Sequence, residues 1–291
     1  MAKPVVLSTD SPADLPQDLQ DLHKIRSIPL YVNILGRSLR DSIDITPPEI
    51  FNTYARNKIV PTTSAIPVGE YQAHFTELLH AGANAVVHFC IGGLISSSYQ
   101  NAAIAAQDFE DVYVIDSESM SIGITLQLLH AAQLRAAGRS AAEIAEDALL
   151  WRKRVRTTAL LGSVTYMRRS GRCSAVSALG ANLLSIRPVL GMTDGKLAAL
   201  KKLRGKPQDV HRQYLEDLFD APENIDPEIA FLYHTGISPE EFLAAKALVE
   251  SKGVFREVRS GHAGCITCTH CGDKCLILMY AYKEAGAEAT A

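Results

Sequence analysis

Residues 85–102, AVVHFCIGGLISSSYQNA, indicate the fold class more clearly than the segments around them. The first seven of these residues are apolar except for His88, as expected for a strand that is buried on both faces. Two glycines and three serines follow, and residues 99–102 then have helical character. A strand, a tight turn and a helix in this order are typical of a parallel α/β sheet. We expect His88 to be a hydrogen-bonded core residue with no functional role.

The rest of the N-terminal half repeats this alternation. Thr46 is suited to cap a helix with prolines in its first turn, and Gly138 is suited to separate two longer helices. Short strands are predicted over 5–8, 28–34 and 112–115, and the longer helices over 121–137 and 141–155. Because polar residues follow the strands, we expect a site at the carboxyl edge of the sheet. The pattern predicts a three-layer α/β/α domain with a parallel sheet.

The second half has a different pattern. Asp194-Gly195 is a hairpin signal between two strand candidates, which indicates antiparallel pairing. Strands are predicted over 157–164, 188–192, 196–203, 229–234, 265–270 and 276–282, and helices over 174–184, 208–219 and 239–251. We therefore expect a two-layer α/β domain with a mixed sheet. The chain of 291 residues is divided into domains 1–156 and 157–291.

Composition and charge exclude several classes of protein. The formal net charge is −3, whereas nucleic-acid binders carry a basic excess, so no nucleic-acid partner is expected. No segment approaches the ~18 apolar residues of a membrane span, and the N-terminal apolar run is too short for a signal peptide. We therefore expect a cytoplasmic protein. Its six cysteines are then expected to be reduced thiols.

Two groups of hydroxyls could bind an anion. Thr62-Thr63-Ser64 follows Pro61, and its hydroxyls could donate to an oxyanion. Taken alone, this group is better explained as the cap of a helix over 68–79. The loop 92–98 joins a strand to a helix, so its backbone N–H groups and the helix dipole favour an anion such as a carboxylate. Capping of that helix by a flexible loop is the alternative.

Basic and imidazole groups occur in the second half. Arg168, Arg169 and Arg172 flank Gly171, and Arg204 and His270 follow further along the chain. Arginine recognises carboxylate and phosphate through a planar fork. Each of these residues, taken singly, is more often part of a surface salt bridge, and their spacing does not show that they converge.

The C-terminal cysteines have a spacing that is also found in iron–sulfur proteins. Cys265, Cys268, Cys271 and Cys275 follow C-x2-C-x2-C-x3-C, although Leu276 stands where proline is usual. If 265–270 is a strand, the first two thiols point to opposite faces and cannot share a metal ion. Reduced thiols are therefore favoured over a metal site. A metal or iron–sulfur protein remains the first alternative.

A serine-dependent acyl hydrolase or transferase is the second alternative. It would use Ser96 and His270. The sequence contains no Gly-x-Ser-x-Gly elbow, and its spacing singles out no Ser–His–acid set. No dinucleotide-binding fingerprint is present either.

Seven segments, in the right order, resemble motifs of the DegV family of fatty-acid-binding proteins. The first four are Ser8-Thr9-Asp10-Ser11 with Asp14-Leu15 (Thr-Asp-Ser), Pro61-Thr62-Thr63-Ser64 (Thr-Ser), Leu94-Ile95-Ser96-Ser97-Ser98-Tyr99-Gln100-Asn101-Ala102 (Leu-Ser-Gly-Thr-Tyr-Gln-Ser-Ala) and Asp116-Ser117 (Asp-Ser). The others are Tyr166-Met167-Arg168-Arg169-Ser170-Gly171-Arg172 (Tyr-Leu-x-x-Gly-Gly-Arg), Arg187-Pro188-Val189-Leu190 with Asp194-Gly195 and Arg204 (Lys-Pro-Ile-Leu, Asp-Gly and Arg) and His270-Cys271-Gly272 (His-Cys-Gly-Pro). The resemblance covers nearly the whole chain.

The resemblance implies a carrier that is not itself an enzyme, with no catalytic residue and no cofactor or metal. It implies that Thr63 and Ser96 hold the carboxylate of a long-chain fatty acid, such as a C16–C18 acid. The acyl chain would enter an apolar tunnel between or beside the halves, and the acid would be carried or presented for phospholipid metabolism, in some members to a separate fatty acid kinase. The residues implied near the head group or its phosphate are Ser64, Ser97, Arg172, Arg204 and His270.

The sequence departs from the family pattern at several places. Ala65 replaces glutamine, Gly92-Gly93 replaces a serine pair, and Ser97 replaces a glycine that would leave the loop freer. Asp273 replaces proline after His-Cys-Gly and adds negative charge where a phosphorylated product would lie. The expectation of a kinase partner is therefore weaker than that of a bound lipid.

Overall fold

The computed structural model describes residues 4–172 and 186–286. Its N-terminal half contains a parallel sheet with strand order β2-β1-β6-β7. The strands are β1 (Val5–Asp10), β2 (Arg26–Ile28), β6 (Ala85–Cys90) and β7 (Val112–Asp116). Every residue of β6 is buried, which explains why its sequence is apolar except for His88. The predicted parallel sheet is confirmed.

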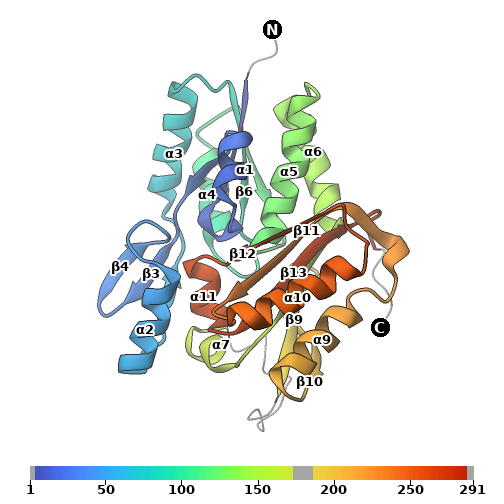
Figure 1. Cartoon of the computed structure of the whole chain (residues 1–291). Coiled ribbons are helices and arrows are strands. Elements are labelled where there is room, and N and C mark those ends of the chain that lie inside the picture. Colours follow the sequence, from blue (N-terminus) through green and yellow to red (C-terminus); the bar gives the residue numbers. More distant parts are fainter. Residues whose placement is uncertain (1–3, 173–185, 287–291) are drawn as a thin grey trace.

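Helices cover both faces of this sheet. Figure 1 shows α3 and α4 on one side and α5 and α6 on the other. The two sides have separate apolar cores, one containing Phe75 and Ala102 and the other Ile124 and Ile144. The helices of this half are η1 (Ser11–Ala13), α1 (Gln17–Leu22), α2 (Pro47–Asn57), α3 (Val68–His80), α4 (Ser98–Ala106), α5 (Ile122–Ala136), α6 (Ala141–Trp151) and η2 (Arg152–Arg154). Gly138 has a φ of 80° after α5, as expected of a break between helices.

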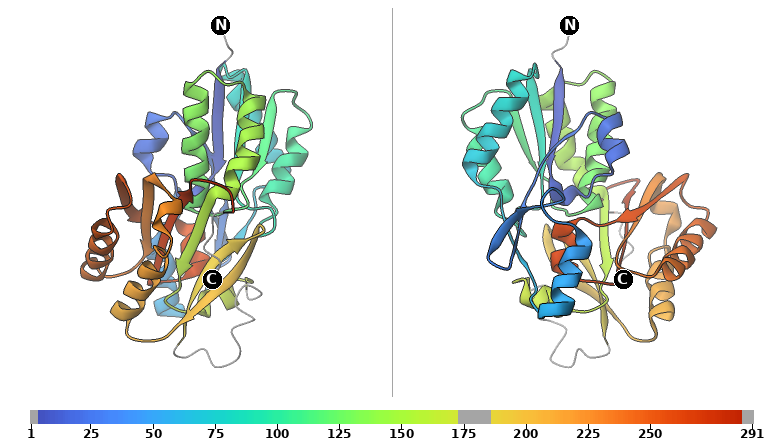
Figure 2. Two further views of the ribbon diagram at one scale, coloured as in Figure 1. Left: turned by 90° about the vertical axis from the view of Figure 1, so that its right-hand side faces the viewer. Right: turned by 60° about the vertical axis from the view of Figure 1, so that its left-hand side comes forward.

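The C-terminal half is built on a mixed sheet with strand order β10-β9-β8-β13-β11-β12. Among the described strands of this sheet, β11 and β12 pair in parallel and the other neighbours pair antiparallel, so the predicted mixed sheet is confirmed. Its strands are β8 (Val155–Leu160), β9 (Arg187–Thr193), β10 (Lys196–Leu203), β11 (Ile225–Thr235), β12 (Glu257–His262) and β13 (Cys275–Tyr282). The helical segments α9 (Pro207–Asp217), η3 (Pro222–Asn224) and α10 (Pro239–Ser251) complete this layer, and Figure 2 shows α9 and α10 on one side of the sheet. The predicted helix over 174–184 lies outside the described residues.

The opposite face of the mixed sheet packs against the N-terminal half. One continuous apolar core contains Val86 and Ile122 from the first half together with Ala159, Ile277 and Met279 from the second. The predicted hairpin is confirmed, because β9 and β10 pair around Asp194 and Gly195, whose φ angles are 48° and 71°. Left-handed angles at both turn residues are those of a type I′ turn.

A small antiparallel sheet, β4-β3-β5, was not predicted. It consists of β3 (Tyr31–Ile34), β4 (Arg37–Arg40) and β5 (Thr62–Ser64). The single strand expected over 28–34 is divided between β2 and β3 at Pro29, which has no N–H to donate to a ladder. Thr46 caps α2 as expected, in a reciprocal capping box with Glu49.

The strand predicted over 265–270 is wrong. These residues form helix α11 (Cys265–Cys271), which packs against α2, β3, β5 and α7 (Thr165–Arg169). Two carboxylates of the N-terminal half cap it. Asp14 Oδ1 accepts from the N–H of Gly264 at 2.9 Å, and Asp41 Oδ1 accepts from the N–H of Cys265 at 3.1 Å. Anionic groups at a helix N-terminus stabilise it, and these caps come from residues far away in the sequence.

In the part of the chain that the structure describes, no helix has the length and apolar character needed to cross a membrane.

Candidate functional site

A cavity of about 170 Å³ lies where the two halves meet. Its wall combines β5, the loop after β6, α7, β10 and α11, so it collects residues from most of the chain. The polar lining residues are Thr63, Ser96, Ser97, Arg172, Thr267, His270 and Cys271, and the apolar ones are Pro12, Leu30, Ala65, Ile91, Ile95, Met120, Met167, Leu197 and Ile266. Five residues predicted for the head group are therefore in one wall: Thr63, Ser96, Ser97, Arg172 and His270.

The loop 92–98 is held against the strand β7 by its glycines. The N–H of Gly93 donates to Asp116 Oδ1 at 2.9 Å. A Cβ atom at Gly93 would lie 2.8 Å from Asp116 Oδ2 and 2.8 Å from a ring carbon of Tyr99. The backbone can therefore approach this closely only without a side chain at residue 93. The departure to glycine at this position thus has a local structural reason.

Ser96 is the outer end of a buried chain of hydroxyl groups. Its Oγ donates to Ser98 Oγ at 3.1 Å, and the Ser98 side chain lies near the Tyr71 hydroxyl. The Tyr71 hydroxyl then donates to Asp10 Oδ1 at 2.6 Å. Ser98, Tyr71 and Asp10 are fully buried. The chain fixes Ser96 in the cavity wall, and neither Tyr71 nor Ser98 was predicted as a contributor.

Thr63 is held by His270. Thr63 Oγ1 lies 2.9 Å from His270 Nε2, and the other ring nitrogen, Nδ1, lies 2.8 Å from Ser170 Oγ. Burial, helped by the nearby charge of Arg172, lowers the pKa of His270 to about 3. The imidazole is therefore neutral at physiological pH. The Arg172 guanidinium, which lines the same cavity, is the cation that can face an anionic head group.

Arg172 is positioned by the same loop that carries Ser96. Its Nη2 donates to the carbonyl oxygen of Ile95 at 3.0 Å. This contact joins Arg172, in the second half of the chain, to the loop 92–98 in the first half. A guanidinium beside two hydroxyls in a largely apolar cavity is suited to a carboxylate with an apolar tail.

Two predicted residues are not in the cavity wall. Ser64 is exposed and accepts a hydrogen bond from Asn33 Nδ2 at 2.6 Å. Arg204 is exposed beyond the end of β10 and is absent from the lining. The preference for a helix cap at residues 62–64 is wrong, because they form β5 and the N-cap of α3 is Pro67.

The structure brings together a Ser–His–Asp set that the sequence spacing did not reveal. His88 Nδ1 lies 3.0 Å from Ser8 Oγ, and its Nε2 lies 3.1 Å from Asp10 Oδ1. All three side chains have an exposed fraction of 0% and none lines the cavity, so a substrate cannot reach them. In the hydrolase alternative, Ser96 would be the nucleophile and His270 its base. The Ser96 hydroxyl instead hydrogen-bonds Ser98, and the His270 ring hydrogen-bonds Thr63 and Ser170.

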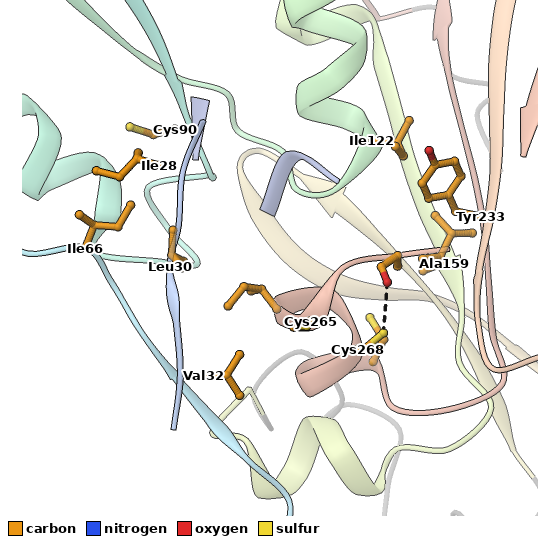
Figure 3. Close-up of a cluster of buried hydrophobic side chains, with 14 of the residues drawn as sticks. Ile28, Leu30, Val32, Ile66, Cys90, Ile122, Ala159, Tyr233, Cys265 and Cys268 are labelled. Carbon is orange, nitrogen blue, oxygen red and sulfur yellow. Dashed lines mark hydrogen bonds between the residues drawn. The ribbon is translucent and has the colours of Figure 1, made fainter. Parts of the chain in front are cut away.

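The C-terminal cysteines are buried thiols in and beside α11. Cys265 Sγ donates to the carbonyl oxygen of Ile45, and Cys268 Sγ donates to that of Ala263. Figure 3 shows both side chains inside the apolar core. Burial raises the pKa of Cys265 to about 12, so a thiolate, the form that binds metals, is disfavoured. Among the described residues, the one close group of three or more metal-ligand types is Asp10, His88 and Cys90.

Comparison with known proteins identifies the family of this chain. The family model described as "Uncharacterised protein, DegV family" matches residues 4–283. The chain belongs to the DegV family. A DegV domain-containing protein of Caldanaerobacter subterraneus subsp. tengcongensis is 31% identical over 272 residues, which are 92% of this chain and 95% of that relative. The resemblance inferred from the seven DegV motifs is confirmed.

Solved DegV structures have the same fold. A DegV family protein from Thermus thermophilus, described for its fatty acid binding, superimposes with a TM-score of 0.88 at 28% identity and covers 96% of this chain and 99% of its own. DegV of Bacillus subtilis, described as a fatty acid binding protein, gives a TM-score of 0.84 at 25% identity and covers 97% and 100%. The DegV fold thus extends over nearly the whole of each chain.

Proposed function

We propose that this DegV chain binds a long-chain fatty acid, with the carboxylate at Thr63 and Ser96 and the acyl chain along the apolar wall of the cavity. One observation carries the proposal: a single cavity contains both hydroxyls and the Arg172 guanidinium, while most of its other lining residues are apolar. The descriptions of the Thermus thermophilus and Bacillus subtilis relatives as fatty acid binders support it.

The energetics favour a lipid with a polar end. Burial of about 15 methylene groups at roughly 0.8 kcal/mol each contributes about 12 kcal/mol before the costs of ordering and association. The head group needs to be oriented and left without unpaired polar atoms, which hydroxyl donors and one guanidinium can provide.

The size of the cavity sets a condition on the acyl chain. About 170 Å³ is smaller than the roughly 300 Å³ at which pockets for drug-sized ligands begin. A C16–C18 chain therefore requires side chains in the wall to move. Met120 and Met167 are unbranched and flexible, so they are suited to open a tunnel between the halves.

The finer roles are also part of the proposal. We assign residues 1–156 and 157–291 to two domains, a division that falls near the start of β8 (Val155–Leu160), the first strand of the mixed sheet. The bound acid would be carried for lipid metabolism and presented to a separate fatty acid kinase. Asp273, which the sequence led us to expect near the phosphate of a phosphorylated product, is not among the lining residues of the cavity.

Mass spectrometry of an organic extract of the purified protein tests the proposal. One fatty acid per chain is expected, and its mass gives the chain length. A clean extract from a protein that also fails to take up added C16 and C18 acids would contradict it. Incubation with acyl esters separates a carrier from a hydrolase: the carrier releases no acid, whereas a hydrolase does so until Ser96→Ala abolishes turnover.

A further inference from the structure

Ser170, which immediately follows α7, connects the protein interior to the head-group hydroxyl through His270. Its exposed fraction is 5%, and its Oγ lies 2.8 Å from His270 Nδ1. Among the described residues, Ser170 Oγ hydrogen-bonds no other side chain than His270. On the far side of the ring, His270 Nε2 lies 2.9 Å from Thr63 Oγ1 in the cavity wall. The three groups thus form a line from the core to the cavity.

The two tautomers of a neutral His270 give the cavity opposite properties. If the proton is on Nε2, the ring donates to Thr63 Oγ1, and the Thr63 hydroxyl proton is free to donate to a ligand. If the proton is on Nδ1, the ring accepts from Thr63, which then offers only lone pairs to the cavity. A carboxylate is attracted in the first case and repelled in the second.

Hydrogen-bond satisfaction distinguishes the two arrangements. With the proton on Nδ1, Ser170 accepts from the ring and its own O–H has no described side-chain acceptor in a buried place, which is costly. With the proton on Nε2, Ser170 donates to Nδ1, and the O–H left over is that of Thr63. Thr63 is only half-buried and faces the cavity, where water or a ligand can accept from it. The second arrangement is therefore favoured.

We propose that Ser170 is a positioning residue that holds His270 as the Nε2–H tautomer, so that Thr63 acts as a donor and the cavity selects an ionised carboxylate over a neutral head group. This inference rests on the proposed function for the identity of the ligand. Ser170 stands where the motif Tyr-Leu-x-x-Gly-Gly-Arg has glycine, which lacks a hydroxyl. The tautomer itself can be measured on the protein without a ligand.

Nitrogen-15 NMR of histidine-labelled protein tests the first half. The His270 signals are assigned by their loss in His270→Asn. In the wild type, Nε2 is expected to have the shift of a protonated nitrogen and Nδ1 that of an unprotonated one. Ser170→Ala is expected to give a mixture of tautomers, and Ser170→Thr, which keeps the hydroxyl, to restore the wild-type pattern. A protonated Nδ1 in the wild type, or an unchanged pattern in Ser170→Ala, would overturn the inference.

Binding of hexadecanoic acid and hexadecan-1-ol tests the second half. Ser170→Ala is expected to weaken binding of the acid by about three- to tenfold, the worth of one hydrogen bond, and to leave the alcohol nearly unchanged, since an alcohol can donate or accept. Ser163→Ala, which removes a hydroxyl outside the cavity, is the control and should change neither. Equal losses for acid and alcohol would refute selection through Thr63. A wild type that binds neither refutes the proposed function, while the tautomer pattern still decides the role of Ser170.

Discussion

Asp14 Oδ1 accepts a hydrogen bond from the backbone N–H of Gly264 at 2.9 Å, across 250 residues of sequence. Ser121 and Thr267 donate their hydroxyls to the other oxygen of the same carboxylate. The contact fastens α11, which carries His270, to the residue that follows η1 in the N-terminal half. Burial, reinforced by the charge of Asp41, raises the pKa of Asp14 to about 7 despite these three donors.

This raised pKa predicts a dependence of stability on pH. The folded protein holds the Asp14 proton up to about pH 7, whereas the unfolded chain releases it near pH 3.8. The folded state therefore binds more protons between these values, and the contribution of Asp14 to the free energy of unfolding falls as pH rises through this window. In Asp14→Asn this fall should be absent. Denaturant unfolding of both proteins from pH 5 to pH 8 measures it, and parallel curves would show that Asp14 does not titrate in this range.

Removal of both head-group hydroxyls should weaken lipid binding. Thr63→Ala combined with Ser96→Ala is expected to cost at least about 1–3 kcal/mol of affinity for a fatty acid, because the carboxylate loses the Thr63 donor and the Ser96 hydroxyl, which donates to a ligand once it turns away from Ser98. Ser64→Ala is the matched control, since Ser64 adjoins Thr63 but is exposed and outside the cavity wall. Titration calorimetry compares the variants. If the double variant binds the fatty acid with wild-type affinity, the assignment of these two hydroxyls to the head-group site is wrong.

Substitution of the two arginines implied by the family motifs should affect fatty-acid binding differently. Arg172 lines the cavity and Arg204 does not. Arg172→Gln is expected to weaken binding of the acid by about 1.5–3 kcal/mol, the usual worth of a hydrogen bond to a charged group, and Arg204→Gln to leave it unchanged. Affinities of both variants for the same fatty acid are to be measured at one salt concentration. A larger loss from Arg204→Gln would mean that the head group lies elsewhere.

The close approach at Gly93 predicts a stability effect. Gly93→Ala places a Cβ atom 2.8 Å from Asp116 Oδ2 and from Tyr99, so the loop must shift, at a cost of about 1–3 kcal/mol. Gly69→Ala in α3 is the control, because nothing lies within 4 Å of its added Cβ and alanine favours a helix. Thermal unfolding should show a lower Tm for the first variant only. Equal Tm values would mean that the loop adapts without strain.

Local patterns predicted much of the fold. The run from Ala85 to Cys90 is apolar throughout except for His88, and it is a fully buried parallel strand. The Asp194-Gly195 turn and the Thr46 cap were also predicted, since each depends on a few adjacent residues. The failures have a different cause. Residues 265–270 form a helix because Asp14 and Asp41 cap it, and residues 62–64 form a strand because β3 pairs with them.

Patterns in the amino-acid sequence were sufficient to predict the α/β class, the parallel and mixed sheets, the family and five of the residues in the cavity wall. These follow from periodicity, from turn chemistry and from ordered motifs, which are local in the chain. The packing of distant elements, by contrast, sets Arg204 away from the cavity of Thr63, joins Tyr71 to Asp10 and brings Ser170 to His270. Hydrogen bonds between residues that are distant in the sequence depend on how the layers pack. This packing produces no periodic pattern in the sequence from which such contacts could be predicted.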